Sequence, residues 1–136
     1  MKPTTEEKNI AIAREAFDKV FNQRDFSAFD KYWSPNYIQH SAHIPPGRDG
    51  LRNLVKSFET VRYEQNMIMA DGDYVMCHGR FVGLPGPNWI VVDIIRFEDG
   101  ILAEHWDIIQ DEATKESSVS GNPMFGNEFG TIPLPK

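Results

Sequence analysis

The feature that most constrains the fold is a change in the spacing of apolar side chains near residue 61. Before this point, apolar residues recur every three or four positions, which is typical of amphipathic helices. After it they alternate with polar residues, which is the pattern of half-buried strands. Helices followed by a meander of strands predict an α+β fold, in which a curved sheet packs against its own N-terminal helices.

The strands are predicted by four alternating runs and by the turn signals between them. Asp71-Gly72 separates the first two runs, and Asp99-Gly100 separates the last two. A longer turn rich in glycine and proline connects the middle pair. The four runs are approximately residues 62–70, 73–83, 88–98 and 101–111.

The preceding part of the chain predicts three helices and a loop. Thr4 and Glu7 have the spacing of a capping box, which begins the first helix. A short second helix carries Phe29 and Trp33, and Pro35 ends it. Residues 34–50 are expected to form a loop because prolines and glycines interrupt them. The third helix follows, with an apolar stripe of Leu51, Leu54, Val55 and Phe58.

Length and composition bound the class of protein. A chain of 136 residues, 40% of them apolar, can form one domain with its own core. We expect this domain to span residues 1–111, with an irregular tail or extended arm over residues 112–136. The net charge of −6 disfavours nucleic-acid and anionic-membrane partners. With one cysteine, Cys77, the chain cannot form an internal disulfide. No apolar run has the length of a membrane span or of a secretion signal. We therefore expect a cytoplasmic protein.

Residues able to transfer protons concentrate in the last predicted hairpin. In its second strand, His105 and Asp107 point to one face, whereas Glu104 and Trp106 point to the other. If the first strand adds Asp93 to the face of His105, the three side chains form a compact titratable cluster, because facing side chains in a sheet lie about 5 Å apart.

The length of the turn decides whether Asp93 joins His105. A loop of two residues places Asp93 opposite Trp106, and a loop of three residues places it opposite His105. We favour the three-residue loop because it also brings Arg96 and Glu104 together on the other face, where they can form an ion pair.

An apolar setting would suit this cluster to proton transfer. A carboxylate in an apolar cavity is poorly solvated, so its pKa rises toward the range useful for a base. A neighbouring histidine can then relay a proton or donate a hydrogen bond to a substrate oxygen. The alternative is a solvated ion pair on an open sheet face, which contributes little. Both the buried and the solvated interpretation stay open, because the cluster has aliphatic neighbours that suit a buried site. These neighbours are Val91, Ile95, Ala103 and Ile109.

The predicted loop before the third helix contains two histidines, His40 and His43. Histidines three residues apart could begin a metal site, but no third histidine or cysteine lies nearby in the sequence, so we expect no metal. We expect His40 to lie over the open end of the sheet as a polar group of the cavity, while His43 suits plain surface.

Further residues are candidates for binding a substrate. Trp33 and Trp89 either pack in the core or line an apolar ligand site. His78 shares a strand face with Arg80, and the sequence does not decide whether that face turns to the cavity. The candidate substrate-binding residues are Trp33, Tyr37, His78, Trp89, Ile95 and Ile109.

Four segments also carry a family resemblance. They are Tyr37-Ile-Gln-His40, Pro45-Pro-Gly-Arg-Asp-Gly50, Ala70-Asp-Gly-Asp-Tyr-Val75 and the closing segment Asp93-Ile-Ile-Arg-Phe-Glu-Asp-Gly-Ile-Leu-Ala-Glu-His-Trp-Asp107. In this order they resemble the SnoaL-like polyketide cyclase branch of the nuclear transport factor two-like superfamily. The resemblance covers approximately residues 5–111. It implies a cone, in which a strongly bent antiparallel or mixed sheet, wrapped around N-terminal helices, encloses one apolar pocket.

The resemblance further implies chemistry without a metal or an organic cofactor. Cyclases of this branch use an aspartate, at the position that matches Asp107, as the acid and base of an intramolecular aldol condensation. His105, Asp93 and His40 would then polarise the carbonyl group or stabilise the enolate. The chain departs from its relatives at Asp93, where some cyclases have histidine. It also has His78-Gly79-Arg80 where related epoxide hydrolases have Arg-x-Asp.

Together these observations predict a cofactor-independent acid–base enzyme of cyclase, isomerase or lyase type, with aldol-like chemistry on a small, largely apolar carbonyl compound. The alternatives are a non-catalytic ligand-binding or dimerisation domain of the same fold, and a hydrolase that activates water at the same aspartate. The outer sheet face is too apolar to remain in water, so we expect a homodimer through this convex face, in which the tail can cross to the neighbouring subunit. Its apolar residues are Val92, Ile94, Leu102, Trp106 and Ile108.

Overall fold

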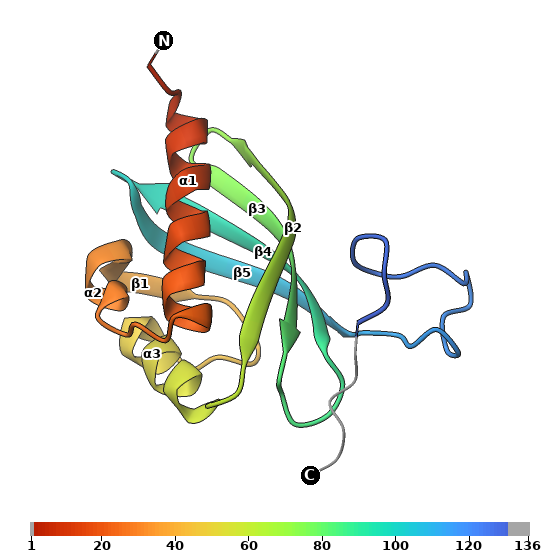
Figure 1. Ribbon diagram of the computed structural model, residues 1–136. Coiled ribbons are helices and arrows are strands. Elements are labelled where there is room, and N and C mark those ends of the chain that lie inside the picture. Colours follow the sequence, from red (N-terminus) through yellow and green to blue (C-terminus); the bar gives the residue numbers. More distant parts are fainter. Residues whose placement is uncertain (1, 131–136) are drawn as a thin grey trace.

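The computed structural model describes residues 2–130, in which helices pack against one sheet (Figure 1). The helical segments are α1 (Thr5–Phe17), its π-helical extension η1 (Asp18–Asn22), α2 (Ala28–Tyr32) and α3 (Gly47–Ser57). The strands are β1 (Trp33–Gln39), β2 (Arg62–Asp71), β3 (Tyr74–Val82), β4 (Trp89–Glu98) and β5 (Ile101–Asp111). Within residues 2–130, no helix has the length and apolar character needed to cross a membrane.

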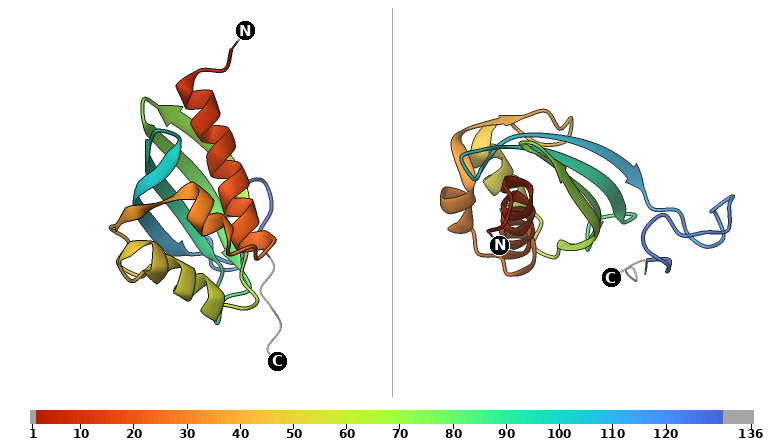
Figure 2. Two further views of the ribbon diagram at one scale, coloured as in Figure 1. Left: turned by 90° about the vertical axis from the view of Figure 1, so that its left-hand side faces the viewer. Right: turned by 90° about the horizontal axis from the view of Figure 1, so that it is seen from above.

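The strands form one mixed, five-stranded sheet in the order β1-β5-β4-β3-β2. β1 runs parallel to β5, and all other neighbouring strands are antiparallel. The sheet curves strongly, and α1 lies along its concave side (Figure 2). This arrangement confirms the predicted α+β class, with a curved mixed sheet wrapped around N-terminal helices.

Helix α1 begins where the capping pattern predicts. The backbone N–H of Glu7 donates to Thr4 Oγ1 at 3.1 Å and so satisfies one of the free amides of the first turn. Toward the other end, Phe17 and Phe21 pack on Tyr63 of β2, with ring centroids 5.3 and 5.8 Å apart. This aromatic cluster attaches α1 and η1 to the concave face of the sheet.

Strand β1 lies where the sequence predicts the beginning of a loop over residues 34–50. The interpretation was wrong since Pro35 lies in an edge strand, where a missing backbone N–H is tolerated. Trp33 and Tyr37 of β1 turn inward and are only 2% and 6% exposed. Helix α3 also begins earlier than expected, at Gly47, directly after Pro46.

The hairpin between β4 and β5 has a two-residue turn followed by a bulge. Glu98 pairs with Ile101, and both turn residues, Asp99 and Gly100, have positive φ. The register then shifts by one at Ala103, the extra residue of the bulge. The three-residue loop that the sequence favoured was therefore wrong.

The bulge changes the partners of the hairpin but keeps the predicted faces. Asp93 lies opposite Asp107 rather than His105, which faces Ile95. The side chains of Asp93, Asp107, His105 and Ile95 all remain on the concave face. The observed pairing differs from the expected one by two residues, and a shift of two keeps each side chain on the same face. Arg96 and Glu104 lie directly opposite each other on the convex face, with Arg96 Nε 2.9 Å from Glu104 Oε1.

The segment after β5 is an irregular arm, part of which packs against β3. Phe125 is buried, with its ring centroid 4.5 Å from the guanidinium carbon of Arg80 and 5.4 Å from the centroid of the His78 ring. Glu112 forms an ion pair with the same Arg80. Residues 131–136, which belong to the same predicted tail, lie outside the described residues.

Candidate active site

A cavity of about 200 Å³ lies between the concave face of the sheet and the helices. Its walls are mostly apolar and aromatic, and its polar groups come mainly from β4 and β5. The lining includes Phe17, Phe21, Trp33, Tyr37, His43, Leu54, Phe58, Trp89, Val91, Asp93, Ile95, His105, Asp107 and Ile109.

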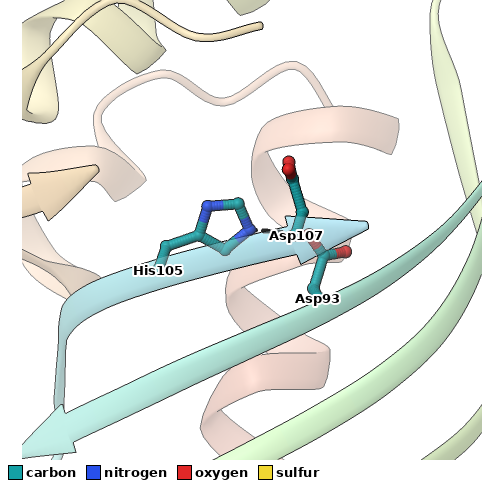
Figure 3. A group of neighbouring side chains, drawn as sticks. All are labelled: Asp93, His105 and Asp107. Carbon is teal, nitrogen blue, oxygen red and sulfur yellow. Dashed lines mark hydrogen bonds and ion pairs between the residues drawn. The ribbon is translucent and has the colours of Figure 1, made fainter. Parts of the chain in front are cut away.

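Three titratable side chains that line the cavity lie close together, as Figure 3 shows. His105 Nε2 lies 2.7 Å from Asp93 Oδ1, and Asp107 offers an oxygen within 4.8 Å of the ligand atoms of both. Asp93 and His105 are only 4% and 5% exposed, whereas Asp107 is half-buried. The apolar, buried interpretation of the cluster is therefore the one that fits the fold.

Gln39 completes this group, although no sequence pattern identified it as a site residue. His105 Nδ1 lies 2.7 Å from Gln39 Oε1, and the backbone N–H of Ser41 donates to the same oxygen at 2.9 Å. Gln39 is aligned with His105 by the parallel pairing of β1 and β5. A prediction of β1 and of its parallel pairing with β5 would have placed Gln39 beside His105.

Burial sets the protonation of the groups around the cavity. Burial raises the pKa of Asp93, and the negative charge of Asp107 acts in the same direction, while the hydrogen bond and charge of His105 oppose them. Burial, followed by the charge of Asp93, also raises the pKa of Tyr37, against hydrogen bonds from Trp33 and Gln39. Tyr37 is consequently a neutral hydroxyl at the cavity wall.

Five of the six candidate substrate-binding residues lie in the cavity wall. They are Trp33, Tyr37, Trp89, Ile95 and Ile109. The sixth, His78, lies on the opposite sheet face, where Phe125 covers it. Because neighbouring residues of a strand alternate, the buried Cys77 and Gly79 face inward and His78 faces outward.

His40 also lies outside the cavity, so its predicted place in the site was wrong. It follows Gln39 and emerges on the convex face, where Nε2 lies 2.7 Å from Glu104 Oε2 and the ring stacks on Trp106 at 4.7 Å. His43, expected at the surface, instead lines the cavity, with its ring 5.7 Å from that of Trp89.

Asp93, His105 and Asp107 have ligand types that a divalent cation accepts, but their arrangement is that of a hydrogen-bonded group. The 2.7 Å contact of His105 with Asp93 is a hydrogen-bond distance, and the second ring nitrogen is held by Gln39. The described residues thus fit proton transfer better than metal coordination.

Comparison with known proteins identifies relatives of this architecture. A family model described as a SnoaL-like domain matches residues 13–105. No curated protein matches the chain. Among solved structures, a candidate ketosteroid isomerase from Kribbella flavida is 18% identical, with a TM-score of 0.73 over 93% of this chain and 98% of that one.

Two proteins from Streptomyces have the same fold. AclR, a candidate hydroxylase from Streptomyces galilaeus, is 25% identical, with a TM-score of 0.66 over 79% of this chain and 81% of that one. TsrD from Streptomyces laurentii is 20% identical, with a TM-score of 0.66 over 79% and 92% of the two chains.

Proposed function

Because the chain belongs to the SnoaL-like domain family, we propose that it is a cofactor-independent acid–base enzyme of cyclase, isomerase or lyase type. Its substrate would be a small, largely apolar carbonyl compound. The observation that carries the proposal is the buried Asp93–His105 pair beside Asp107 in an otherwise apolar cavity. Titratable groups gathered in such a cavity are typical of active sites.

Asp107 is the proposed base. It is the most exposed member of the cluster, and its oxygens are not held by His105, so it can approach a bound substrate. In the proposed step Asp107 takes a proton from the carbon next to a carbonyl group, which leaves an enolate. The enolate carbon attacks a second carbonyl group, and Asp107 returns the proton to the new alkoxide.

Tyr37 is the proposed donor to the carbonyl oxygen. Its hydroxyl oxygen accepts from Gln39 Nε2 at 3.4 Å, so its own proton is free to point into the cavity. Since the raised pKa keeps Tyr37 neutral, it can donate a hydrogen bond that strengthens as the substrate oxygen gains negative charge. The aromatic walls, including Trp33 and Trp89, would hold the apolar part of the substrate.

Exchange of α-protons tests this proposal without knowledge of the natural substrate. Ketones of one or two rings, such as 2-tetralone, are incubated with the protein in D₂O, and deuterium uptake is followed by NMR. We expect the wild type to accelerate exchange and Asp107→Asn to lose about 10²- to 10⁴-fold of that rate, the usual contribution of a positioned base.

The matched control is Asp111→Asn, at the exposed end of the same strand, which should exchange at the wild-type rate. Binding of the ketones without exchange, or equal exchange by Asp107→Asn and the wild type, would refute catalysis. Binding alone would support the alternative, a non-catalytic ligand-binding domain of this fold.

The convex face supports a further proposal, a homodimer. Several apolar side chains there are strongly exposed, including Met69 at 57%, Met76 at 44% and Ile108 at 66%. Ile94 and Trp106 extend the same surface between them. Leu102, which the sequence assigned to this face, is buried at the cavity wall instead, because the bulge at Ala103 interrupts the alternation between Leu102 and Glu104 and the two side chains point to opposite faces.

A further inference from the structure

Gln39 determines how protons are arranged around His105. Its Oε1 faces both His105 Nδ1, at 2.7 Å, and the backbone nitrogen of Ser41, at 2.9 Å. The Ser41 N–H can only donate, so the amide atom that receives it is the oxygen of Gln39 and not its nitrogen. A backbone group thus fixes the orientation of the Gln39 amide.

An amide oxygen can only accept, so His105 Nδ1 must carry a proton. The other ring nitrogen, Nε2, lies 2.7 Å from Asp93 Oδ1, and this contact also requires a proton. That proton lies either on Asp93, as a carboxylic acid, or on His105, as an imidazolium. In both arrangements the Asp93–His105 pair has no net charge.

We propose that Gln39 is a positioning residue that fixes His105 in the Nδ1–H form and thereby keeps the Asp93–His105 pair neutral. The consequence for catalysis rests on the proposed function. When the Asp93–His105 pair is neutral, neither of its members balances the negative charge of Asp107. Asp107 is therefore the group best suited to accept the α-proton.

Loss of the Gln39 acceptor would change this charge balance. His105 could then carry its single proton on Nε2 and donate a hydrogen bond to Asp93 without transferring that proton. The Asp93 carboxylate would stay ionised beside Asp107. A second negative charge in the cavity opposes the formation of an enolate, since like charges repel strongly where water is excluded.

The other titratable groups that face Asp93 cannot compensate for such a charge. They are Tyr37 on β1, Tyr63 on β2 and Cys77 on β3, and burial, followed by the charge of Asp93, raises the pKa of each. All three are neutral near pH 7. Among the described residues, Asp93 Oδ2 has no hydrogen-bond partner, so an ionised Asp93 would carry an unpaired buried oxygen.

Nitrogen-15 NMR of the His105 ring tests the arrangement in the absence of any substrate. In the wild type we expect a proton on Nδ1. In Gln39→Leu the acceptor is lost, and we expect the proton of the neutral ring on Nε2. Gln39→Glu retains an acceptor and should keep the proton on Nδ1, while Gln110→Leu, at an exposed glutamine of β5, should leave the ring unchanged.

Two spectroscopic results would overturn the proposal: an unprotonated Nδ1 in the wild type, or a proton that stays on Nδ1 in Gln39→Leu. The wild-type measurement decides the first point even if Gln39→Leu does not fold. The rescue by Gln39→Glu separates loss of the acceptor from a general disturbance of the β1 edge.

The exchange assay then distinguishes the positioning role from the proposed function. We expect Gln39→Leu to lower kcat for α-proton exchange by about 100-fold with little change in KM, because the charge of the site changes and its apolar walls do not. Wild-type exchange with undiminished kcat in Gln39→Leu would overturn the positioning role and leave the proposed function standing. Absence of exchange in the wild type would overturn the proposed function and the catalytic role of Gln39 together, while the NMR result still decides the proton arrangement.

Discussion

Glu112→Gln is expected to destabilise the protein substantially, although it lies outside the sheet. Glu112 accepts from Arg80 through three contacts, with Oε1 2.9 Å from Nε and Oε2 3.1 Å from Nε and 2.6 Å from Nη2. The side chains of Arg80 and Glu112 are only 9% and 5% exposed. Removing one charge of a buried ion pair costs about 3–5 kcal/mol, because the remaining charge stays desolvated.

The lower end of this range applies to Glu112→Gln. Glutamine can still accept one hydrogen bond, and Glu64, half-exposed, remains 3.1 Å from Arg80 Nη1. We therefore expect a loss of about 3 kcal/mol in the free energy of unfolding. For 136 residues, the unfolding entropy converts this loss to a decrease of about 10 °C in Tm.

Urea unfolding and thermal circular dichroism at pH 7 measure both quantities. Glu116→Gln is the matched control, because Glu116 lies on the same arm, is exposed and has no ion pair among the described residues. It should remain within about 0.5 kcal/mol of the wild type. If Glu112→Gln also remains within that margin, the reasoning from burial and pairing is refuted.

The same ion pair predicts a dependence of stability on pH. Burial would raise the pKa of Glu112, but hydrogen bonds from Arg80 and Asn88, together with the charge of Arg80, outweigh it and hold the pKa below the ordinary value of 4.5. A pKa that is lowered in the folded state contributes stability above the ordinary value, and this contribution is lost as the pH falls through the folded value. The wild type should therefore lose more stability than Glu112→Gln on acidification below about pH 4.5.

Two further predictions concern the two faces of the sheet. Ile108→Glu would place like charges across a twofold interface on the convex face. Light scattering should therefore find a dimer for the wild type and a monomer for the variant. A monomeric wild type at micromolar concentration would refute the dimer. Gly79→Ala would bring a methyl group within 3 Å of the Tyr63 ring, which Phe17, Phe21 and Phe81 hold in place. We expect a loss of about 1–3 kcal/mol in urea unfolding, and an unchanged midpoint would show that this contact is not restrictive.

Local patterns were sufficient for most of the fold. Thr4 and Glu7 correctly marked the start of α1, and the alternating runs correctly indicated β2 to β5. The parallel strand β1 escaped prediction because its partner, β5, lies about 65 positions later in the chain, and a local pattern that contains Pro35 cannot reveal such a partner. With β1 unknown, the direction of His40 and the contact of Gln39 with His105 could not be deduced.

The arrangement of Asp93, His105 and Asp107 on one face depends on the bulge in β5. The Asp99-Gly100 turn has two residues, and a regular hairpin with that turn would place Asp93 across from Trp106, with His105 on the other face. Ala103 adds one residue to β5 and reverses the direction of every side chain from Glu104 onward. Leu102 precedes the bulge and points inward opposite Phe97, whereas the reversal places Trp106 and Ile108 on the convex face. One extra residue therefore assembles both the titratable cluster and the apolar outer surface, which makes the two proposals, catalysis inside and association outside, consequences of the same local geometry.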